Sequence, residues 1–234
     1  MKSGFVHSRT RVFLFVLFFL STISLFLSAT AIAFIYDDFS DAAIDTSKWD
    51  AVDSKGLFKQ SDGRLIFSAA RAAGTLKSTR TFRPGLFSME FYDFTSTNME
   101  LHGSHKGSFA ALGLITADGN FVRIIRCQNS LNSKPYGVFE VNFMVGKDFK
   151  VYYVPTSVTS GRLRMNYDGT NVTFYYDDGS GWKNTGWREA GTSNSWSGVW
   201  NPGWTSDPQL FIRGYDLTYS TSFKVDNVEY SPVP

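Results

Sequence analysis

Short runs of β-branched and aromatic residues, separated by Gly, Asp, Asn and Ser, recur along the chain and constrain its fold most strongly. No segment after residue 33 shows the sustained 3.6-residue periodicity of a helix. Runs of this length, bounded by turn residues, are typical of strands. The sequence therefore predicts an all-β protein with strands in 64–68, 85–94, 109–115, 120–127, 136–143, 149–154, 161–167, 171–176, 209–215 and 222–230.

Turn residues support antiparallel pairing of these strands. Asp-Gly dipeptides at 118–119 and 168–169 each separate two runs, and such pairs tolerate the positive φ of tight hairpins. The firmest predicted hairpin covers residues 161–176. Together these features predict a sandwich of two antiparallel sheets.

The run at 136–143 also predicts how its side chains divide. Strand residues alternate between the two faces of a sheet. One face then carries Phe139, Val141 and Phe143, and the other carries Val138, Glu140, Asn142 and Met144. A sheet with one apolar and one partly polar face is indicated.

The first 33 residues differ from the rest of the chain. Three basic residues precede a long apolar run, and Ala31 and Ala33 stand at the −3 and −1 positions of a cleavage site after Ala33. This order is typical of a secretory signal peptide. The alternative is an uncleaved membrane anchor, because the 22 residues Val12–Ala33 are just long enough to span a bilayer. We predict a leader at 1–33, a single domain at 34–234 and an extracellular location.

Charge and cysteine content exclude some functions. Three of the 23 Lys and Arg residues lie in the leader, whereas all 21 Asp and Glu lie after it, so the remaining chain carries about −1. No basic run of the kind that follows a phosphate backbone remains, and we expect no nucleic-acid partner. The lone Cys127 excludes an intramolecular disulfide and is expected to be a small buried residue. Asn171 heads an Asn-Val-Thr glycosylation sequon.

Three segments resemble a known superfamily. They are the opening IYDDFSDAAIDTSKWD, the hairpin GRLRMNYDGTNVTFYYDDGSGW and the closing FKVDNVEY. Together they are similar to the concanavalin A-like lectin/glucanase superfamily, including its laminin-G-like members. The resemblance implies a jelly-roll sandwich with one curved sheet, and it implies glycan ligands on the concave face or at the loop rim.

The sequence lacks the carboxylate motif of the glycoside hydrolases in this superfamily. Laminarinase-type members of the superfamily carry Glu-x-Asp-x-x-Glu or Glu-x-Asp-x-Glu on one strand, because two carboxyl groups must point from the same face. None of the five Glu residues begins Glu-x-Asp. Glu90 and Asp93 are three residues apart, so a regular strand sends them to opposite faces unless a bulge intervenes. We predict no catalytic residue from these motifs.

Possible metal ligands occur at two places. His102, His105 and Glu100 lie close together in sequence, but we interpret them as a polar loop because zinc needs a further ligand. Asp37, Asp38 and Asp41 near the start of the domain and Asp226 with Asn227 near its end offer the oxygen ligands that Ca²⁺ prefers. In jelly-roll binding modules a structural calcium joins the terminal strands. Asp38 and Asp226 are the predicted ligands, and a capped turn with a solvated strand residue is the alternative.

Tryptophan is concentrated in one loop. Trp196, Trp200 and Trp204 lie among Gly and Pro, which exclude a helix. Indole rings stack on sugar rings while nearby polar groups bind hydroxyls. With Trp182 and Trp187 they form the predicted carbohydrate-binding set. The alternative is a lid packed on the sandwich, since Trp is highly buried on average.

Together these features predict a secreted lectin-like module that binds an extracellular glycan or polysaccharide and has no catalytic activity of its own. Two alternatives stay open. One is a glycoside hydrolase or polysaccharide lyase whose site the motifs do not show. The other is an adhesion protein of a cell envelope or matrix.

Overall fold

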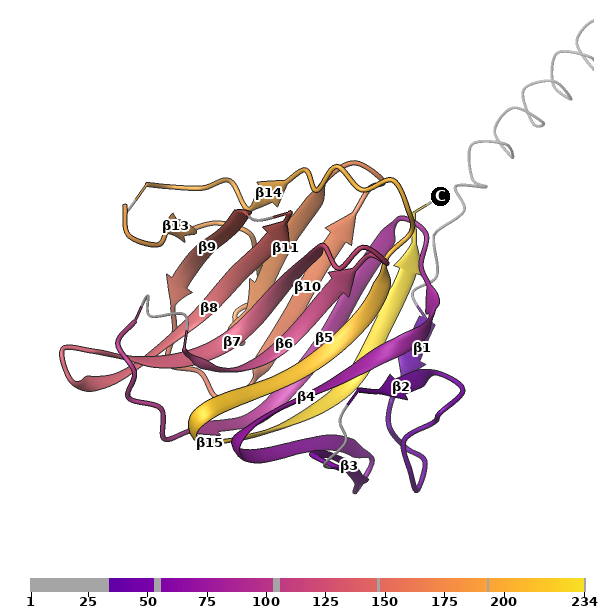
Figure 1. Cartoon of the computed structure of the whole chain (residues 1–234), viewed down its shortest axis with the longest axis horizontal. Helices are drawn as coiled ribbons and strands as arrows, with labels where there is room; N and C mark the ends of the chain where they lie inside the picture. The colour runs from indigo at the N-terminus through magenta and orange to yellow at the C-terminus, as the bar shows by residue number, and fades with distance from the viewer. Residues whose placement is uncertain (1–33, 53–55, 103–105, 147, 193, 234) are drawn as a thin grey trace, which may run out of the picture. The chain divides into compact units, whose positions relative to one another are not determined.

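The computed structural model describes residues 34–52, 56–102, 106–146, 148–192 and 194–233, which all belong to one compact unit. These residues contain strands and no helix (Figure 1). The strands are β1 (Phe34–Asp37), β2 (Trp49–Ala51), β3 (Phe58–Ser61), β4 (Arg64–Thr81), β5 (Gly85–Ser96), β6 (Ser108–Ile115), β7 (Phe121–Leu131), β8 (Lys134–Val145), β9 (Asp148–Pro155), β10 (Gly161–Tyr167), β11 (Val172–Asp177), β12 (Trp182–Lys183), β13 (Arg188–Glu189), β14 (Val199–Trp200) and β15 (Gln209–Pro232).

Two antiparallel sheets share the long strands β4 and β15. The first half of β15, up to Asp216, pairs with β6 and with the second half of β4. Strands β7, β8, β9 and β13 extend this first sheet, and β2 closes its other edge. From Ser220 onwards β15 pairs with the first half of β4 and with β5, which β10 and β11 follow in the second sheet. The predicted all-β jelly-roll sandwich is confirmed.

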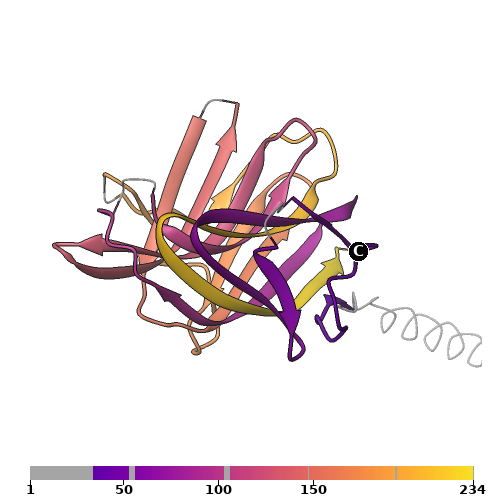
Figure 2. The ribbon, with the colours of Figure 1, turned by 60° about the horizontal axis from the view of Figure 1, so that its bottom comes forward.

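The two long strands change sheets at the same level. The register of β15 against β4 shifts between Asp216 and Ser220, and Arg71 in β4 has a positive φ of 57°. Figure 2 shows the strong curve of β15 at this bend. A residue in the left-handed region turns the strand locally and lets one chain serve both layers.

The core lies between the sheets and follows the predicted alternation. Leu112, Ile124, Val141 and Ile212 of the first sheet are fully buried, as are Phe87, Met89, Leu163 and Phe174 of the second. On β8, Phe139, Val141 and Phe143 point into this core, as predicted. Neighbouring residues of the same strands therefore point to the opposite, outer face of the first sheet.

The predicted hairpin at 161–176 is confirmed as β10 and β11. Asp168 accepts hydrogen bonds from the backbone N–H groups of Thr170 and Asn171, and Gly169 has a φ of 97°. An Asx turn followed by a left-handed glycine is the geometry that this dipeptide favours. The sequon at Asn171 therefore lies at the start of β11.

The predicted leader at 1–33 lies outside the described residues, so secretion and the alternative anchor stay predictions. In the part of the chain that the structure describes, no helix has the length and apolar character needed to cross a membrane.

Candidate functional site

The outer face of the first sheet carries the polar side chains of the candidate site. Its rows run across the strands in register. One row contains Lys77, Phe211, Gly113, Arg123, Asn142 and Val151. The next contains Thr75, Arg213, Ala111, Ile125, Glu140 and Tyr153. We call this surface, made by these two rows and their neighbours, the groove face.

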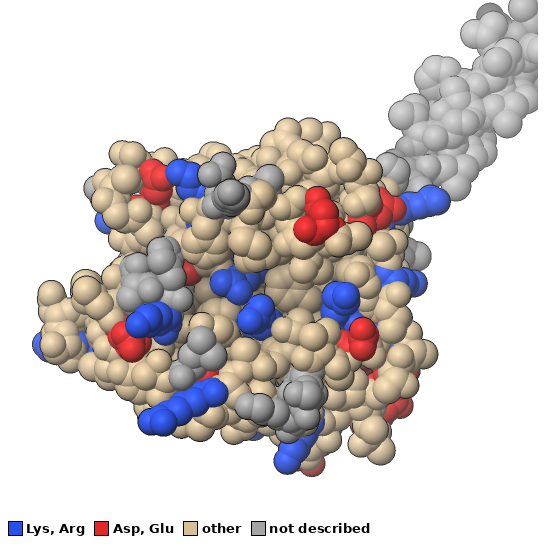
Figure 3. Space-filling view, viewed as in Figure 1, with Lys and Arg blue, Asp and Glu red and all other residues tan. Residues whose placement is uncertain are grey.

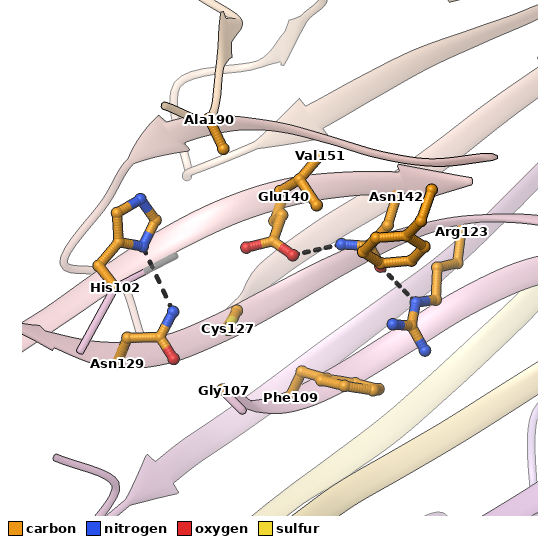
Figure 4. Close-up of a pocket in the computed structure, with 11 residues that line it drawn as sticks. His102, Gly107, Phe109, Arg123, Cys127, Asn129, Glu140, Asn142, Val151 and Ala190 are labelled. Carbon is orange, nitrogen blue, oxygen red and sulfur yellow. Dashed lines mark hydrogen bonds between the residues drawn. The ribbon is translucent and has the colours of Figure 1, made fainter. Parts of the chain in front are cut away.

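Glu140 lies at one end of a hydrogen-bonded chain on the groove face. The side-chain amide of Asn142 donates to the Glu140 carboxyl group, and its oxygen accepts from Nε of Arg123 (Figure 4). Burial raises the pKa of Glu140 to about 7, against the opposing effects of Arg123 and Asn142. The carboxyl group therefore exchanges its proton near neutral pH, which a general acid requires.

His102 is a second titratable group, and it lines the same recess of the groove face as Glu140. Its Nδ1 lies 3.3 Å from the amide nitrogen of Asn129, and its ring meets those of Tyr136 and Tyr153 edge to face at 4.9 and 4.6 Å. Nε2 is buried and has no hydrogen-bond partner among the described residues. Burial lowers the pKa of His102, so the ring is neutral at neutral pH.

The recess between these groups is small. It has a volume of about 30 Å³ and is lined by His102, Asn129, Glu140, Asn142 and Arg123, among others. A single water molecule or sugar hydroxyl fills such a space. The recess therefore admits one small group, and a larger ligand would lie above it. Figure 4 shows Glu140 between His102 and Asn142.

Carboxylates are scarce on the groove face. In its strand rows the described carboxylates are Glu140 and Asp50, which stands opposite Lys77 on β2. Five strand spacings separate β2 from β8, roughly 24 Å at ~4.8 Å each. The two carboxyl groups therefore cannot act on one glycosidic bond, for which a separation of about 5–10 Å is needed.

The other acidic pair considered from the sequence lies elsewhere. β5 bulges at Asp93, which has a φ of 52°. Glu90 accepts hydrogen bonds from Tyr92 and Asn227, and Asp93 pairs with Lys224 at 2.8 Å. These partners lie on the outer face of the second sheet, away from the groove face.

The tryptophan loop packs against the open edge of the core. Trp196 stacks on Tyr152 at 4.0 Å and Trp200 stacks on Phe143 at 4.0 Å. Trp204 meets Tyr167 edge to face at 5.4 Å. Trp196, Trp200 and Trp204 are all half-buried. This packing favours the lid interpretation for the loop.

Trp182 and Trp187, the other two tryptophans of the predicted carbohydrate-binding set, differ in burial. Trp187 is only 1% exposed and lies beneath the loop, edge to face with Tyr176. Trp182 is half-buried on β12, with the guanidinium of Arg164 3.8 Å from its ring centroid. A buried ring has no free face for a sugar. The carbohydrate-binding role of the five rings stays a prediction.

The predicted calcium ligands have other partners. Asp226 lies 3.6 Å from Nε of Arg64, and Asp38 accepts a hydrogen bond from the backbone of Ser40. Asp37 is buried and accepts from Nε1 of Trp49 at 2.7 Å. Among the described residues, no three His, Cys, Asp or Glu side chains gather as a metal site requires. Calcium binding stays a prediction, and it has no support from this geometry. His105 lies outside the described residues.

The sequence analysis did not select Glu140 as a site residue, although a signal was present. The alternation at 136–143 placed Glu140, Asn142 and Met144 on one face, and these positions have the spacing of Glu-x-Asp-x-Glu with one carboxylate kept. Asn142 stands where the laminarinase-type motif has Asp, so this strand does not match the motif. The interpretation of His102 as part of a polar loop stays a prediction, and its contact with Asn129 of β7 was not predicted.

Comparison with known proteins supports the fold. No family model matches the chain, and no curated protein matches its sequence. A β-glucanase of Bacillus licheniformis matches in structure with a TM-score of 0.55 and 11% identity, over 87% of this chain and 98% of its own. A glycosyl hydrolase family protein from Mycobacterium fortuitum has a TM-score of 0.55 and 15% identity, over 85% and 98%.

A third match is an immunostimulatory antigen and pseudo β-1,3-glucanase of Mycobacterium tuberculosis. Its TM-score is 0.56 at 13% identity, over 87% of this chain and 98% of its own. At such identities the likeness shows the fold alone. The prediction of a binding module without catalytic activity is contradicted: the neighbours are described as glucanases and glycosyl hydrolases, which favours the alternative prediction, a hydrolase or lyase.

Proposed function

We propose that this chain, which has the concanavalin A-like jelly-roll fold of the lectin/glucanase superfamily, cleaves a polysaccharide that lies along its groove face. The observation that carries the proposal is Glu140, a half-buried carboxyl group with a pKa of about 7 in a recess on the groove face of the first sheet. Breaking a glycosidic bond requires a proton for the departing oxygen. In its neutral form Glu140 donates that proton.

Hydrolysis is the first candidate reaction. The C–O bond breaks, the leaving oxygen takes the proton of Glu140, and a water molecule adds to the anomeric carbon and gives up its own proton. His102 is the base available in the same recess. With the amide nitrogen of Asn129 facing Nδ1, Nε2 would carry the ring proton. The role of base therefore requires the Asn129 amide to be turned, so that its oxygen, which has no partner among the described residues, accepts from Nδ1 and Nε2 is free.

Elimination is the second candidate, and the scarcity of carboxylates on the groove face favours it. It needs one base and one proton donor rather than two carboxyl groups. His102 takes the proton from the carbon beside a sugar carboxylate, the electron pair forms a C=C bond, and the bond to the glycosidic oxygen breaks. Glu140 protonates that oxygen. The water molecule of the hydrolytic route is not consumed.

The test is product analysis on a panel of neutral and acidic polysaccharides. Hydrolysis gives new reducing ends with saturated sugars, whereas elimination gives new reducing ends together with ultraviolet-absorbing unsaturated uronates. Glu140→Gln is the control for contaminating enzymes. A panel without new reducing ends above the level of this control would refute the proposal.

The pH profile is expected to be bell-shaped. Glu140 must keep its proton, so kcat/KM should fall as pH rises through about 7, the pKa of that carboxyl group. His102 must be neutral, so the acidic limb should follow its pKa, which burial lowers from 6.5. Activity should therefore be highest on the acidic side of neutral. A rate that keeps rising to alkaline pH would exclude Glu140 as the proton donor.

A further inference from the structure

We propose that the groove face binds a glycan whose sugars carry carboxylate or sulfate groups, and that Arg123 and Arg213 hold one such group beside Glu140. The inference rests on the proposed function in placing a glycan on the groove face. It adds the class of substrate, and it is argued from a second recess on the same surface.

The second recess lies next to the first and shares Arg123 with it. It has a volume of about 70 Å³, and Lys77, Arg123, Arg213, Phe121 and Phe211 are among its lining residues. These residues come from β4, β7 and β15, which the pairing brings together across β6. Figure 3 shows Lys and Arg side chains gathered in the middle of this hollowed face.

The cations of the recess lack anionic partners. Among the described residues, no carboxylate lies within ion-pair distance of Lys77, Arg123 or Arg213. Asp50 stands opposite Lys77 in the β2–β4 register and balances part of its charge. In the described part of the chain the two arginines have no such neighbour except Glu140, whose pKa of about 7 keeps it largely protonated in more acidic solution.

The arginines also repel each other. Burial, and then the charge of Arg213, lower the pKa of Arg123 to about 10. Nε of Arg213 is buried without a hydrogen-bond partner, and Nε of Arg123 donates only to the neutral Asn142 amide. Two half-buried guanidinium groups in one recess are costly, because charges need pairing when they lose water. An anion between them would remove that cost.

Aromatic rings hold both guanidinium groups in place. Arg123 lies over Phe109 and Phe121, with its guanidinium carbon 4.4 and 5.2 Å from the ring centroids. Arg213 lies 5.6 Å from the ring centroid of Tyr215. A fixed, planar guanidinium matches the oxygen pair of a carboxylate or sulfate. A neutral glucan has no group that would pair with two of them.

Binding measurements on Glu140→Gln test the inference without cleavage of the ligand. The probes are a polyuronate, a sulfated galactan, a neutral glucan, and the same polyuronate after reduction of its carboxyl groups to alcohols. At least one acidic probe should bind about tenfold or more tightly than the neutral ones, and added salt should weaken it. Binding of the polyuronate would indicate a carboxylate ligand, and binding of the sulfated galactan would indicate a sulfate ligand.

Second-site variants in the same background assign the contact. Arg213→Gln should weaken acidic-glycan binding by about tenfold or more, and Arg213→Lys should restore it in part, because the charge is kept and the fork is lost. Arg64→Gln, on the outer face of the second sheet, is the matched control and should bind normally. Melting curves confirm that each variant is folded.

Two outcomes would overturn the inference: binding of both the polyuronate and the sulfated galactan no tighter than that of the neutral probes, or normal acidic-glycan binding by folded Arg213→Gln. Neither outcome depends on catalysis. If acidic glycans bind through Arg213 but the wild type cleaves none of them, the proposed function fails and the inference stands. If a neutral glucan is cleaved and Arg213→Gln has no effect, the reverse holds.

Discussion

Replacing Glu140 by Gln should lower the rate of polysaccharide cleavage by about 10²–10⁴-fold, the usual contribution of a general acid. Gln has almost the same shape and still accepts the hydrogen bond from Asn142, but it has no proton to give. The glycan should bind with similar affinity, so the loss should appear in kcat rather than in KM. Initial rates on the best polysaccharide of the panel measure it.

Glu229→Gln is the matched control for this variant. Glu229 accepts a hydrogen bond from Ser88 at 2.8 Å on the outer face of the second sheet. The substitution makes the same chemical change far from the groove face, and activity should stay at the wild-type level. Wild-type rates for Glu140→Gln would remove the basis of the proposed function.

Replacing Glu140 by Gln should also change the stability of the folded protein, by an amount that depends on pH. The pKa of Glu140 is about 7 in the folded protein and 4.5 for an unperturbed side chain. The protonated carboxyl group therefore contributes its full stabilisation of the folded state below pH 4.5, and this contribution is lost as pH rises to about 7. Gln does not ionise, so the variant should gain stability relative to wild type between these limits. Urea midpoints at pH 4 and pH 8 measure the difference, and an inert packing position would show none.

The sequence predicted strands well where alternation and turns are local. Residues 161–176 form the predicted hairpin because an Asp-Gly turn and two alternating runs agree. The sequence did not show that β4 continues to Thr81, because residues 68–74 at its middle are mostly Ala, Ser and Gly. β4 extends through them because β15 supplies hydrogen-bond partners along most of its length and β2 pairs with residues 76–78. Such support is not local and leaves no pattern in the segment itself.

The candidate site shows the same limit. The face of Glu140 was predictable from the alternation on β8, but its environment was not. Asn142 is two residues away, whereas Arg123 comes from β7 and His102 from the segment before β6. Burial of the carboxyl group, which raises its pKa, depends on all of them. A sequence motif records only the part of a site that one strand carries.

Trp187→Ala should cost about 3–5 kcal/mol of folding free energy, the usual range for truncating a buried Trp. Trp187 is 1% exposed and meets Tyr176 and Trp196 edge to face at 5.4 and 6.3 Å. The tryptophan loop also packs against Trp187. Gly198 has a φ of 74°, and a Cβ there would lie 2.9 Å from Nε1 of Trp187, so the backbone passes directly over the indole. Urea unfolding at pH 6 measures the loss.

Trp182→Ala is the control, because it removes the same side chain from a half-buried position on β12. It loses mainly a cation–π contact with Arg164, and its cost should be about 1 kcal/mol or less.

Trp196→Ala then separates the two interpretations of the loop. As a lid, stacked on Tyr152, it should destabilise the fold clearly. As a sugar platform it should instead leave the urea midpoint nearly unchanged and weaken glycan binding by about 1–3 kcal/mol. The ring contacts with the core favour the lid, and a stable Trp196→Ala protein with impaired glycan binding would reverse that conclusion.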